Sequence, residues 1–300
     1  MRCTITETSL YAMELLRQQP TGFVHSVYRK TVNLRLNGSL LALQVQGSPL
    51  SPLSLITNLA DAQMDALGIQ AGQPVAVRQQ SICICENAAA PIAFDCSDCV
   101  AEDLRLHTVL SDAQQHTLTA SIRRVLSQTS TNGFDLLFHS RDVNADSLIH
   151  TAAKNNMERA LSLYQEGAWH EAADALCRLI GLGIGLTPSG DDFLCGVLAG
   201  ATLFGNTDAP FYRYLRQTVP SYLDRTNDIS RAFVACACSG LFSRAVCSLQ
   251  ALPQPDEIYR MFSAIGHSSG IDTLCGIYFS YLLDHPSGAQ SDPLILTGME

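Results

Sequence analysis

Charged residues are scarce in this sequence. They make up 16% of the 300 residues, against about 25% in an average globular protein. The 28 acidic and 19 basic side chains are dispersed along the chain, and no cluster of lysine and arginine is present that would neutralise a nucleic-acid backbone. We therefore expect no nucleic-acid partner. A hydrophobic content of 47% favours a surface that contacts other subunits.

Long hydrophobic runs are also lacking. A helix needs about 18 to 20 apolar residues to cross a bilayer, but the longest runs, around residues 194–204 and 232–242, are interrupted by glycine, serine or cysteine. We interpret both as buried helices and expect no membrane partner. Residues 1–7 lack the features of a signal peptide, and the eleven cysteines are typical of reduced thiols in a core. These features predict a cytoplasmic protein.

The N-terminal third has the pattern of a β-sheet. Asn37-Gly38 lies between two apolar runs, which predicts a hairpin because both positions of a type I′ turn need positive φ. A short helix is expected over residues 60–66, before Gly68. The expected strands cover residues 23–28, 32–36, 40–45, 74–77, 81–85 and 91–94. Together these elements predict a small barrel or sandwich.

From about residue 101 the hydrophobic period lengthens to that of a helix. Apolar residues recur at helical spacing over residues 118–126, 148–164 and 172–180. Further helices are expected to begin near Ser189, Tyr212, Ser230, Glu257 and Ser269. The chain is therefore predicted to be α+β, with a β-rich N-terminal domain over residues 1–108 and a mainly α-helical domain over residues 109–300.

One eight-residue segment occurs twice. Residues 189–196 read SGDDFLCG and residues 269–276 read SGIDTLCG, so six of eight positions are identical at a separation of 80 residues. Part of this match has a purely structural interpretation. A serine at the N-cap with an acid three residues later is a capping box, which satisfies unpaired backbone N–H groups. That interpretation covers Ser189 with Asp192 and Ser269 with Asp272.

Capping does not explain the glycines of the repeat. Gly196 and Gly276 lie inside their helices, where each costs roughly 1 kcal/mol relative to alanine, so we expect the two helices to cross there with their backbones close together. Such packing brings both helix N-termini into one region, where N–H groups and the helix dipole suit a carboxylate or phosphate. The glycine-rich approach at residues 181–188 lets a ligand touch the backbone, and Thr187 adds a hydroxyl.

Two titratable residues stand outside the capping interpretation. Asp191 is replaced by Ile271 in the second copy, and a carboxylate here suits a substrate amide, a magnesium ion or a lysine. His267 precedes the second copy and suits anion binding or proton transfer, with a histidine bonded within a loop as the alternative. Thr226 and Ser230 mark a third helix start and are further candidates, with a plain N-cap as the alternative.

Several familiar motifs are missing. The glycines of residues 181–185 follow a helical pattern and lack the later spacing of a dinucleotide fingerprint. There is no P-loop, metalloprotease helix or serine-nucleophile elbow. The pairs Cys83/Cys85 and Cys96/Cys99 differ from the usual spacing of structural zinc sites, so buried strand thiols are the preferred interpretation. No cofactor is expected, with magnesium as the one candidate.

Two blocks of the sequence resemble a known family. Residues 183–196 contain Gly-x-Gly-Leu-Thr-Pro-Ser-x-Asp-Asp-x-Leu-x-Gly and residues 266–276 contain Gly-His-x-Ser-Gly-x-Asp-Thr-Leu-x-Gly. Both resemble a domain-of-unknown-function family whose named member is the AllH subunit of oxamate carbamoyltransferase. The resemblance implies a three-subunit enzyme of anaerobic allantoin and purine breakdown, in which phosphate splits oxalurate into oxamate and carbamoyl phosphate. The Ser-Thr/x-Arg-Thr loop of aspartate and ornithine carbamoyltransferases is missing, so the machinery differs or is shared with partner subunits.

These observations define one candidate site and three hypotheses. In the first, the chain is a subunit of an oxamate carbamoyltransferase-like complex that binds oxamate, oxalurate, carbamoyl phosphate or phosphate. In the second, it is a stand-alone magnesium-assisted hydrolase; in the third, it is a non-catalytic scaffold or ligand sensor. The candidate catalytic residues are Asp191, Asp192, His267 and Asp272, and the candidate substrate-binding residues are Gly185, Thr187, Ser189, Gly190, Thr226, Ser230, Ser268, Ser269 and Gly270.

Overall fold

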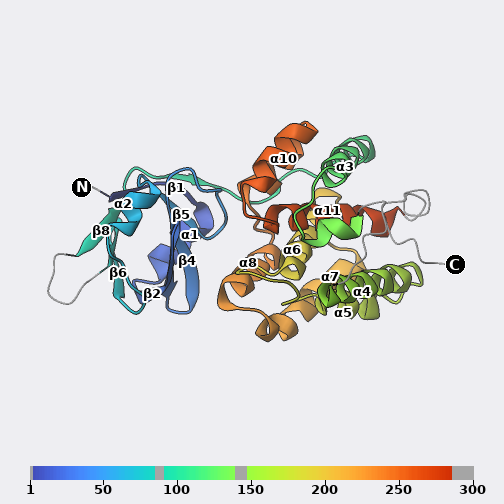
Figure 1. Cartoon of the computed structure of the whole chain (residues 1–300), viewed down its shortest axis with the longest axis horizontal. Coiled ribbons are helices and arrows are strands. Elements are labelled where there is room, and N and C mark those ends of the chain that lie inside the picture. Colours follow the sequence, from blue (N-terminus) through green and yellow to red (C-terminus); the bar gives the residue numbers. More distant parts are fainter. Residues whose placement is uncertain (1–2, 85–90, 139–146, 286–300) are drawn as a thin grey trace. The chain divides into compact units, whose positions relative to one another are not determined.

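The chain forms two compact units. The computed structural model describes residues 3–84, 91–138 and 147–285. The units are Met1–Arg105 and Leu106–Glu300, against a predicted boundary after residue 108. Nine strands and two helices lie in the described part of the first unit, and the second is mostly helical (Figure 1). The predicted α+β fold class, with a β-rich region followed by a mainly helical one, is confirmed.

The strands of the first unit form one closed sheet. Their order is β5-β4-β3-β2-β6-β7-β8-β1-β9, and β1 also pairs with β5. This extra pairing closes the sheet into a barrel, which removes the free edges of the strands in between. The bounds are β1 Cys3–Ser9, β2 Thr21–Tyr28, β3 Thr31–Leu36, β4 Ser39–Gln44, β5 Ser54–Thr57, β6 Pro74–Arg78, β7 Ser81–Ile84, β8 Ile92–Asp95 and β9 Val100–Glu102, with helices α1 Leu10–Gln18 and α2 Asp61–Asp65.

The predicted hairpin at Asn37-Gly38 is confirmed. β3 and β4 are antiparallel with Leu36 opposite Ser39, which leaves two turn residues with φ of 42° at Asn37 and 100° at Gly38. The other predicted strands and the short helix are also present, although residue 85, at the end of one predicted strand, lies outside the described residues. The sequence patterns did not predict β1, α1, β5 or β9.

The second unit is built around two buried helices, α6 (Ser189–Leu203) and α11 (Ser269–Asp284). Figure 1 shows them in the middle of this unit, with α3 and α10 on one side and α4, α5 and α7 on the other. The bounds of the remaining helices are α3 Asp112–Leu126, α4 Leu148–Gln165, α5 Trp169–Cys177, α7 Pro210–Thr218, α8 Asp228–Cys238, α9 Arg244–Ser248 and α10 Pro255–Ser263, with 3-10 helices η1 Phe134–Phe138, η2 Val219–Arg225 and η3 Leu249–Ala251.

The burial of α6 and α11 follows from their composition. Both are apolar on nearly all sides, and a helix of that kind is stable only inside a protein. Twelve of the 15 residues of α6 and twelve of the 16 residues of α11 are buried. The other apolar run, residues 232–242, is not one helix: α8 ends at Cys238, and Gly240 turns the chain with φ of 74° before the buried Phe242.

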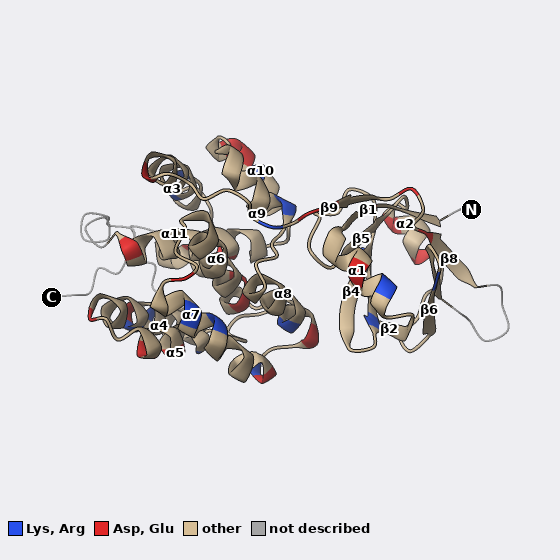
Figure 2. Ribbon diagram, turned by 180° about the vertical axis from the view of Figure 1, so that it is seen from behind, with Lys and Arg blue, Asp and Glu red and all other residues tan. Residues whose placement is uncertain are grey.

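Charged side chains are thinly spread over the fold. Most of the ribbon in Figure 2 belongs to uncharged residues, with short acidic and basic segments scattered between them. Within the described ranges, no helix has both the length and the hydropathy needed to span a membrane.

Candidate functional site

Helices α6 and α11 cross at the two interior glycines. A Cβ on Gly196 would lie 2.1 Å from Thr273 O, and a Cβ on Gly276 would lie 1.9 Å from Phe193 O. The contacts are reciprocal, because Phe193 and Thr273 hold equivalent positions in the two copies of the repeat. The predicted crossing is confirmed. It is a pseudo-twofold contact in which only glycine lets the two backbones meet.

The first glycine of each copy is also explained by packing. A Cβ on Gly190 would lie 1.9 Å from Leu179 O, and a Cβ on Gly270 would lie 1.9 Å from Phe262 O. Each carbonyl belongs to the segment that precedes the repeat, where it follows α5 or lies within α10. The close approach of these carbonyls requires glycine at both positions, independently of any ligand.

The predicted capping boxes are wrong. The N-cap of α6 is Pro188 and that of α11 is Ser268, and neither makes a side-chain cap hydrogen bond to a described residue. Ser189 and Ser269 are the first helical residues, so each acid lies one position further into its helix than a capping box requires. The serine hydroxyls are consequently free to reach other groups.

Each repeated serine faces the acid of the opposite copy. The Ser189 hydroxyl hydrogen-bonds to Asp272, and the Ser269 hydroxyl hydrogen-bonds to Asp192. Thr187 joins the same group, since its Oγ1 lies 2.7 Å from Ser269 Oγ and it also hydrogen-bonds to Asp192. Ser268 also hydrogen-bonds to Asp272. The repeated serines and acids, together with Thr187 and Ser268, therefore form one cluster, which we call the crossing cluster: Thr187, Ser189, Asp192, Ser268, Ser269 and Asp272.

A further segment, absent from the predicted site, closes over Asp272. The Phe134 N–H donates to Asp272 Oδ1 over 2.6 Å, and a Cβ on Gly133 would lie 2.4 Å from the same oxygen. The Gly133 carbonyl contacts His150 Nε2 at 3.0 Å. The sequence signal at this point is Asn132-Gly133, a turn dipeptide, and Asn132 does have a φ of 62°. Nothing local connects this turn to a residue 138 positions away.

Asp272 is buried and Asp192 is half-buried, and neither acid has a counter-ion among the described residues. Burial, followed by repulsion from Asp272, raises the pKa of Asp192 well above its ordinary value. Burial raises the pKa of Asp272 to about 7, against the opposing hydrogen bonds from Phe134 N–H and two serine hydroxyls. Neither carboxylate forms an ion pair with a described residue, and the Oδ2 atom of each is shielded from solvent without a hydrogen-bond partner there. Such atoms are costly to bury, so they mark a place for a donor, a proton or a cation.

Asp191 has a different environment from its neighbour. It is 1% exposed, its Oδ1 accepts from Gly181 N–H over 2.8 Å, and its Oδ2 accepts from the hydroxyls of Thr226 at 2.5 Å and Ser230 at 2.6 Å. Asp191 thereby ties the glycine-rich approach to the start of α8. The reading of Ser230 as an N-cap is wrong, because Asn227 holds that position and accepts from the Ser230 N–H.

The two helices differ in the amides they offer a ligand. At α6, the N–H of Gly190 donates to Leu182 O and those of Asp191 and Asp192 donate to Pro188 O. At α11, the N–H groups of Ser269 and Gly270 find no acceptor among the residues that the structure describes. Ser189 N–H, the first amide of α6, likewise finds no acceptor among the described residues, so free amides occur at both N-termini, one at α6 and at least two at α11.

Two other candidate residues, His267 and Gly185, lie at the surface. His267 is exposed and makes no hydrogen bond or ion pair with a described residue. Gly185 is exposed, with a φ of 113° that favours glycine. Ser268 is half-buried and hydrogen-bonds to Asp272. Of the predicted site, the structure brings together the crossing cluster around Asp272 and, separately, the group held by Asp191.

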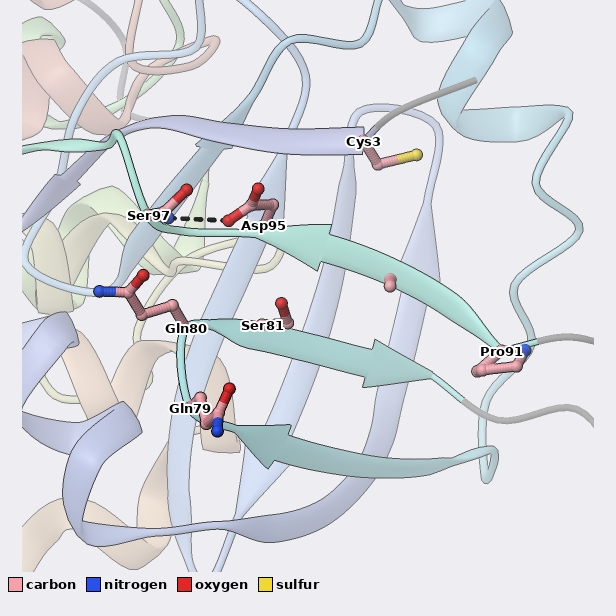
Figure 3. Close-up of a pocket in the computed structure, with 8 residues that line it drawn as sticks. Cys3, Gln79, Gln80, Ser81, Pro91, Asp95 and Ser97 are labelled. Atoms are coloured by element: carbon pink, nitrogen blue, oxygen red, sulfur yellow. Dashed lines mark hydrogen bonds between the residues drawn. The ribbon is translucent and has the colours of Figure 1, made fainter.

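A cavity of about 900 Å³ lies in the first unit, whereas the candidate site residues belong to the second unit. It is lined by Cys3, Gln79, Gln80, Ser81, Pro91, Ala93, Asp95 and Ser97. Figure 3 shows Gln80, Asp95 and Ser97 toward one end and Pro91 at the other, with Ser97 N–H donating to Asp95 Oδ1 over 2.9 Å. No residue of the predicted site lines it.

The cysteine pairs give no sign of metal binding in the described part of the chain. Burial raises the pKa of Cys96 to about 12 and also raises that of Cys99, so both thiols stay protonated at neutral pH. Cys85 lies outside the described residues. Over the described ranges, no group of three or more histidine, cysteine, aspartate or glutamate side chains is arranged to hold a metal ion.

The chain is of a two-domain class, with a β-barrel unit followed by a helical unit that contains two crossed, repeated helices. Comparisons with known families show which family this is. The family model described as "AllH family N-terminal domain" matches residues 4–101, and the model described as "Oxamate carbamoyltransferase subunit AllH" matches residues 179–281. The two matches cover two thirds of the chain, and the second contains both copies of the repeat. The chain belongs to the AllH family. No curated protein and no solved structure matches it.

Proposed function

We propose that this chain is a subunit of an oxamate carbamoyltransferase and that the crossing cluster holds part of the substrate. The family description supports the activity. The observation that carries the site is the pair of shielded, unpartnered Oδ2 atoms of Asp192 and Asp272, within the segment that the family model matches. The reaction converts oxalurate and phosphate into oxamate and carbamoyl phosphate, in the anaerobic breakdown of allantoin and purines in the cytoplasm.

Oxalurate offers the donors that these two oxygens lack. Its ureido group carries N–H on both nitrogens, and an N–H bound to a carboxylate makes a stronger hydrogen bond than one bound to a neutral oxygen. Its carboxylate, or the attacking phosphate, suits the unpaired amides of Ser269 and Gly270 at the N-terminus of α11. The ureido end then lies against the two acids, and the anionic end lies at the helix dipole.

The acids also suit the chemistry. A phosphate oxygen attacks the carbamoyl carbon and forms the new C–O bond, the bond from that carbon to the bridging nitrogen breaks, and the nitrogen takes up a proton to become the amide of oxamate. The proton lost by phosphate balances the one gained by nitrogen. A group transfers protons best when its pKa lies near the working pH, and the pKa of Asp272 is about 7. Asp272 relays this proton, while Asp192 accepts an N–H and orients the ureido group.

The other candidate residues act around this pair. Asp191, bonded on both oxygens within the protein, is a positioning residue that holds the glycine-rich approach, with Thr226 and Ser230 as its donors. Exposed His267 lies beside the start of α11, where it binds an anion. The partner subunits supply the groups that this chain lacks, and the sparsely charged surface contacts them.

The test is carbamoyl transfer by the chain co-expressed with its partner subunits. We expect Asp272→Asn to lower the kcat for phosphate-dependent conversion of oxalurate by about 100-fold or more, while the subunits still co-purify. Asp256→Asn, on the exposed first turn of α10, is the matched control and retains activity. Full activity of Asp272→Asn in an intact complex would overturn the assigned role and favour a scaffold.

A further inference from the structure

The peptide group between Gly133 and Phe134 is hydrogen-bonded on both of its sides. Its N–H donates to Asp272 Oδ1 over 2.6 Å, and its carbonyl oxygen lies 3.0 Å from His150 Nε2. A carbonyl oxygen can only accept, so Nε2 carries the proton of the second bond. His150, the third residue of α4, is therefore connected to Asp272 through a single peptide group.

The turn that carries this peptide group is anchored by other contacts. The N–H and the hydroxyl of Thr131 both donate to the carboxylate of Asp135, each over 2.8 Å, and Asp135 is fully buried. The Gly133 N–H donates to Thr131 Oγ1 over 3.3 Å. The Phe134 ring packs edge-on against Phe193 of α6, with the ring centroids 5.8 Å apart. These contacts fix the backbone of the turn, so the group that bonds to the Gly133 carbonyl sets the tilt and the polarity of the peptide.

The turn approaches Asp272 closely enough to require glycine. A Cβ on Gly133 would lie 2.4 Å from Asp272 Oδ1 and 2.9 Å from its Oδ2, so a side chain here would push the peptide away from the acid. The Phe134 N–H bond is shorter than the length of about 2.9 Å that is typical of N–H···O bonds, as is usual when the acceptor is a carboxylate. Oδ1 is thereby engaged, whereas Oδ2 has no partner among the described residues. The two oxygens of Asp272 are therefore not equivalent.

We propose that His150 is a positioning residue for Asp272, which acts through the Gly133–Phe134 peptide and keeps Oδ2 as the oxygen that exchanges the proton. The carbonyl of the residue before a helix accepts the first bond of that helix, and its second lone pair is open to a side-chain donor. Because the bond from His150 polarises the peptide, the Phe134 N–H donates more strongly. The role in carbamoyl transfer rests on the proposed function, while the hydrogen-bonded connection from His150 to Asp272 does not.

This connection serves the proton relay in two ways. The bond to Oδ1 stabilises the charged form of Asp272 after the acid has passed its proton to the bridging nitrogen of oxalurate. It also holds the plane of the carboxylate, so that Oδ2 keeps its direction during the reaction. Without the His150 donor the bond to Oδ1 weakens, and the proton transfer loses its alignment. Substrate binding depends on other groups, so the loss falls on kcat and not on KM.

The first test is the kinetics of carbamoyl transfer by the chain co-expressed with its partner subunits. His150→Phe keeps a ring and removes the donor, and we expect kcat to fall about tenfold while the KM for oxalurate changes by less than about twofold. His150→Gln restores an N–H donor and should recover most of the lost kcat. His170→Phe, at an exposed position of α5, is the matched control and retains full activity. An unchanged kcat in His150→Phe, an effect on KM alone, or an equal loss in His150→Gln would overturn the proposal.

Nuclear magnetic resonance of the full chain tests the connection without an enzyme assay. In the unaltered chain, the ring nitrogen signals of His150 should show a proton on Nε2, and a ring protonated on Nδ1 alone would contradict the bond to Gly133. The amide proton signal of Phe134 should move upfield in His150→Phe, because its bond to Asp272 weakens, and should return in His150→Gln. An unmoved signal in His150→Phe would overturn the inference.

The two measurements separate this inference from the proposed function. An unaltered complex that transfers no carbamoyl group overturns the proposed function, whereas the Phe134 signal still decides the connection from His150 to Asp272. Full transfer by the His150→Phe complex overturns this inference alone, because Asp272→Asn tests the role of the acid itself.

Discussion

The first turns of α6 and α11 share most of their sequence and differ in what surrounds them. Ser189, Gly190 and Asp192 recur as Ser269, Gly270 and Asp272, and these positions build the reciprocal contacts of the crossing cluster. The position between them is Asp191 in α6 and Ile271 in α11. Asp191 accepts three hydrogen bonds from the glycine-rich approach and the start of α8, whereas Ile271 is 1% exposed and packs in the core.

This difference separates two tasks. The repeated residues form the helix crossing and place two acids in one cluster. The unrepeated Asp191 links the start of α6 to residue Gly181 and to the start of α8 by hydrogen bonds. Backbone carbonyls accept from the second to fourth amides of α6 but from neither of the first two of α11, so α11 leaves more N–H groups without an acceptor among the described residues. The repeat thus supplies symmetric packing, and the unrepeated residues and the N-terminal amides make the surroundings of the two helix starts differ.

Substitutions at the two unrepeated positions, Asp191 and Ile271, should lower the stability of the helical unit the most. Ile271→Asp buries a carboxylate that has no partner, and we expect the free energy of unfolding of the helical unit to fall by about 4 kcal/mol. Asp191→Ile leaves three donors unpaired and should cost about 3 kcal/mol. Urea unfolding followed by circular dichroism measures both, with Ile271→Val, expected to cost about 1 kcal/mol, as the control. A stable Ile271→Asp chain would mean that the two entrances are interchangeable.

The crossing itself gives a smaller and symmetric effect. Gly276→Ala and Gly196→Ala place a methyl about 2 Å from a carbonyl oxygen of the other helix, so each should destabilise the helical unit by about 2 to 3 kcal/mol through overpacking. Gly266→Ala is the matched control, because its Cβ would lie 3.6 Å from the nearest atom, Ser269 Oγ. Thermal unfolding compares the three. Unequal costs at Gly196 and Gly276 would contradict the pseudo-twofold contact.

The fold class and the crossing could be predicted from sequence because their signals are local or repeated. Asn37-Gly38 predicts a hairpin because both residues accept the positive φ of its turn. Gly196 and Gly276 predict a close helix contact because glycine inside a helix is destabilising unless close packing requires it. Strands such as β5 and β9, of four and three residues, are too short to show a period. They are formed by pairing with strands far along the chain.

The details of the site depended on contacts that no local pattern contains. A serine followed by an acid three residues later predicts a capping box, but Pro188 takes the N-cap of α6 and the hydroxyl of Ser189 turns to Asp272 in the other helix. The importance of Phe134, which donates to Asp272 from 138 residues away, is likewise a tertiary effect. The sequence pattern therefore suggested candidate residues, and tertiary packing decided which of them lie together.

The last prediction concerns the pH dependence of stability. It tests the central claim, that the helix crossing keeps Asp192 and Asp272 in an environment that disfavours their charged forms. Because burial raises the pKa of Asp272 to about 7, from about 3.9 in the unfolded chain, the folded state binds this proton more tightly. Its contribution to stability is therefore complete below about pH 4 and is lost as the pH rises through 7, by at most about 1.4 kcal/mol per pH unit. Asp272→Asn lacks this loss.

The decisive measurement is the free energy of unfolding of both chains between pH 5 and pH 8, with a chelator present so that no cation contributes. We expect the difference between Asp272→Asn and the unaltered chain to grow in favour of the variant as the pH rises, reaching about 1 to 2 kcal/mol at pH 8. Asp256→Asn should show no such trend. An Asp272→Asn chain less stable than the unaltered one at pH 8, or a difference independent of pH, would contradict the account.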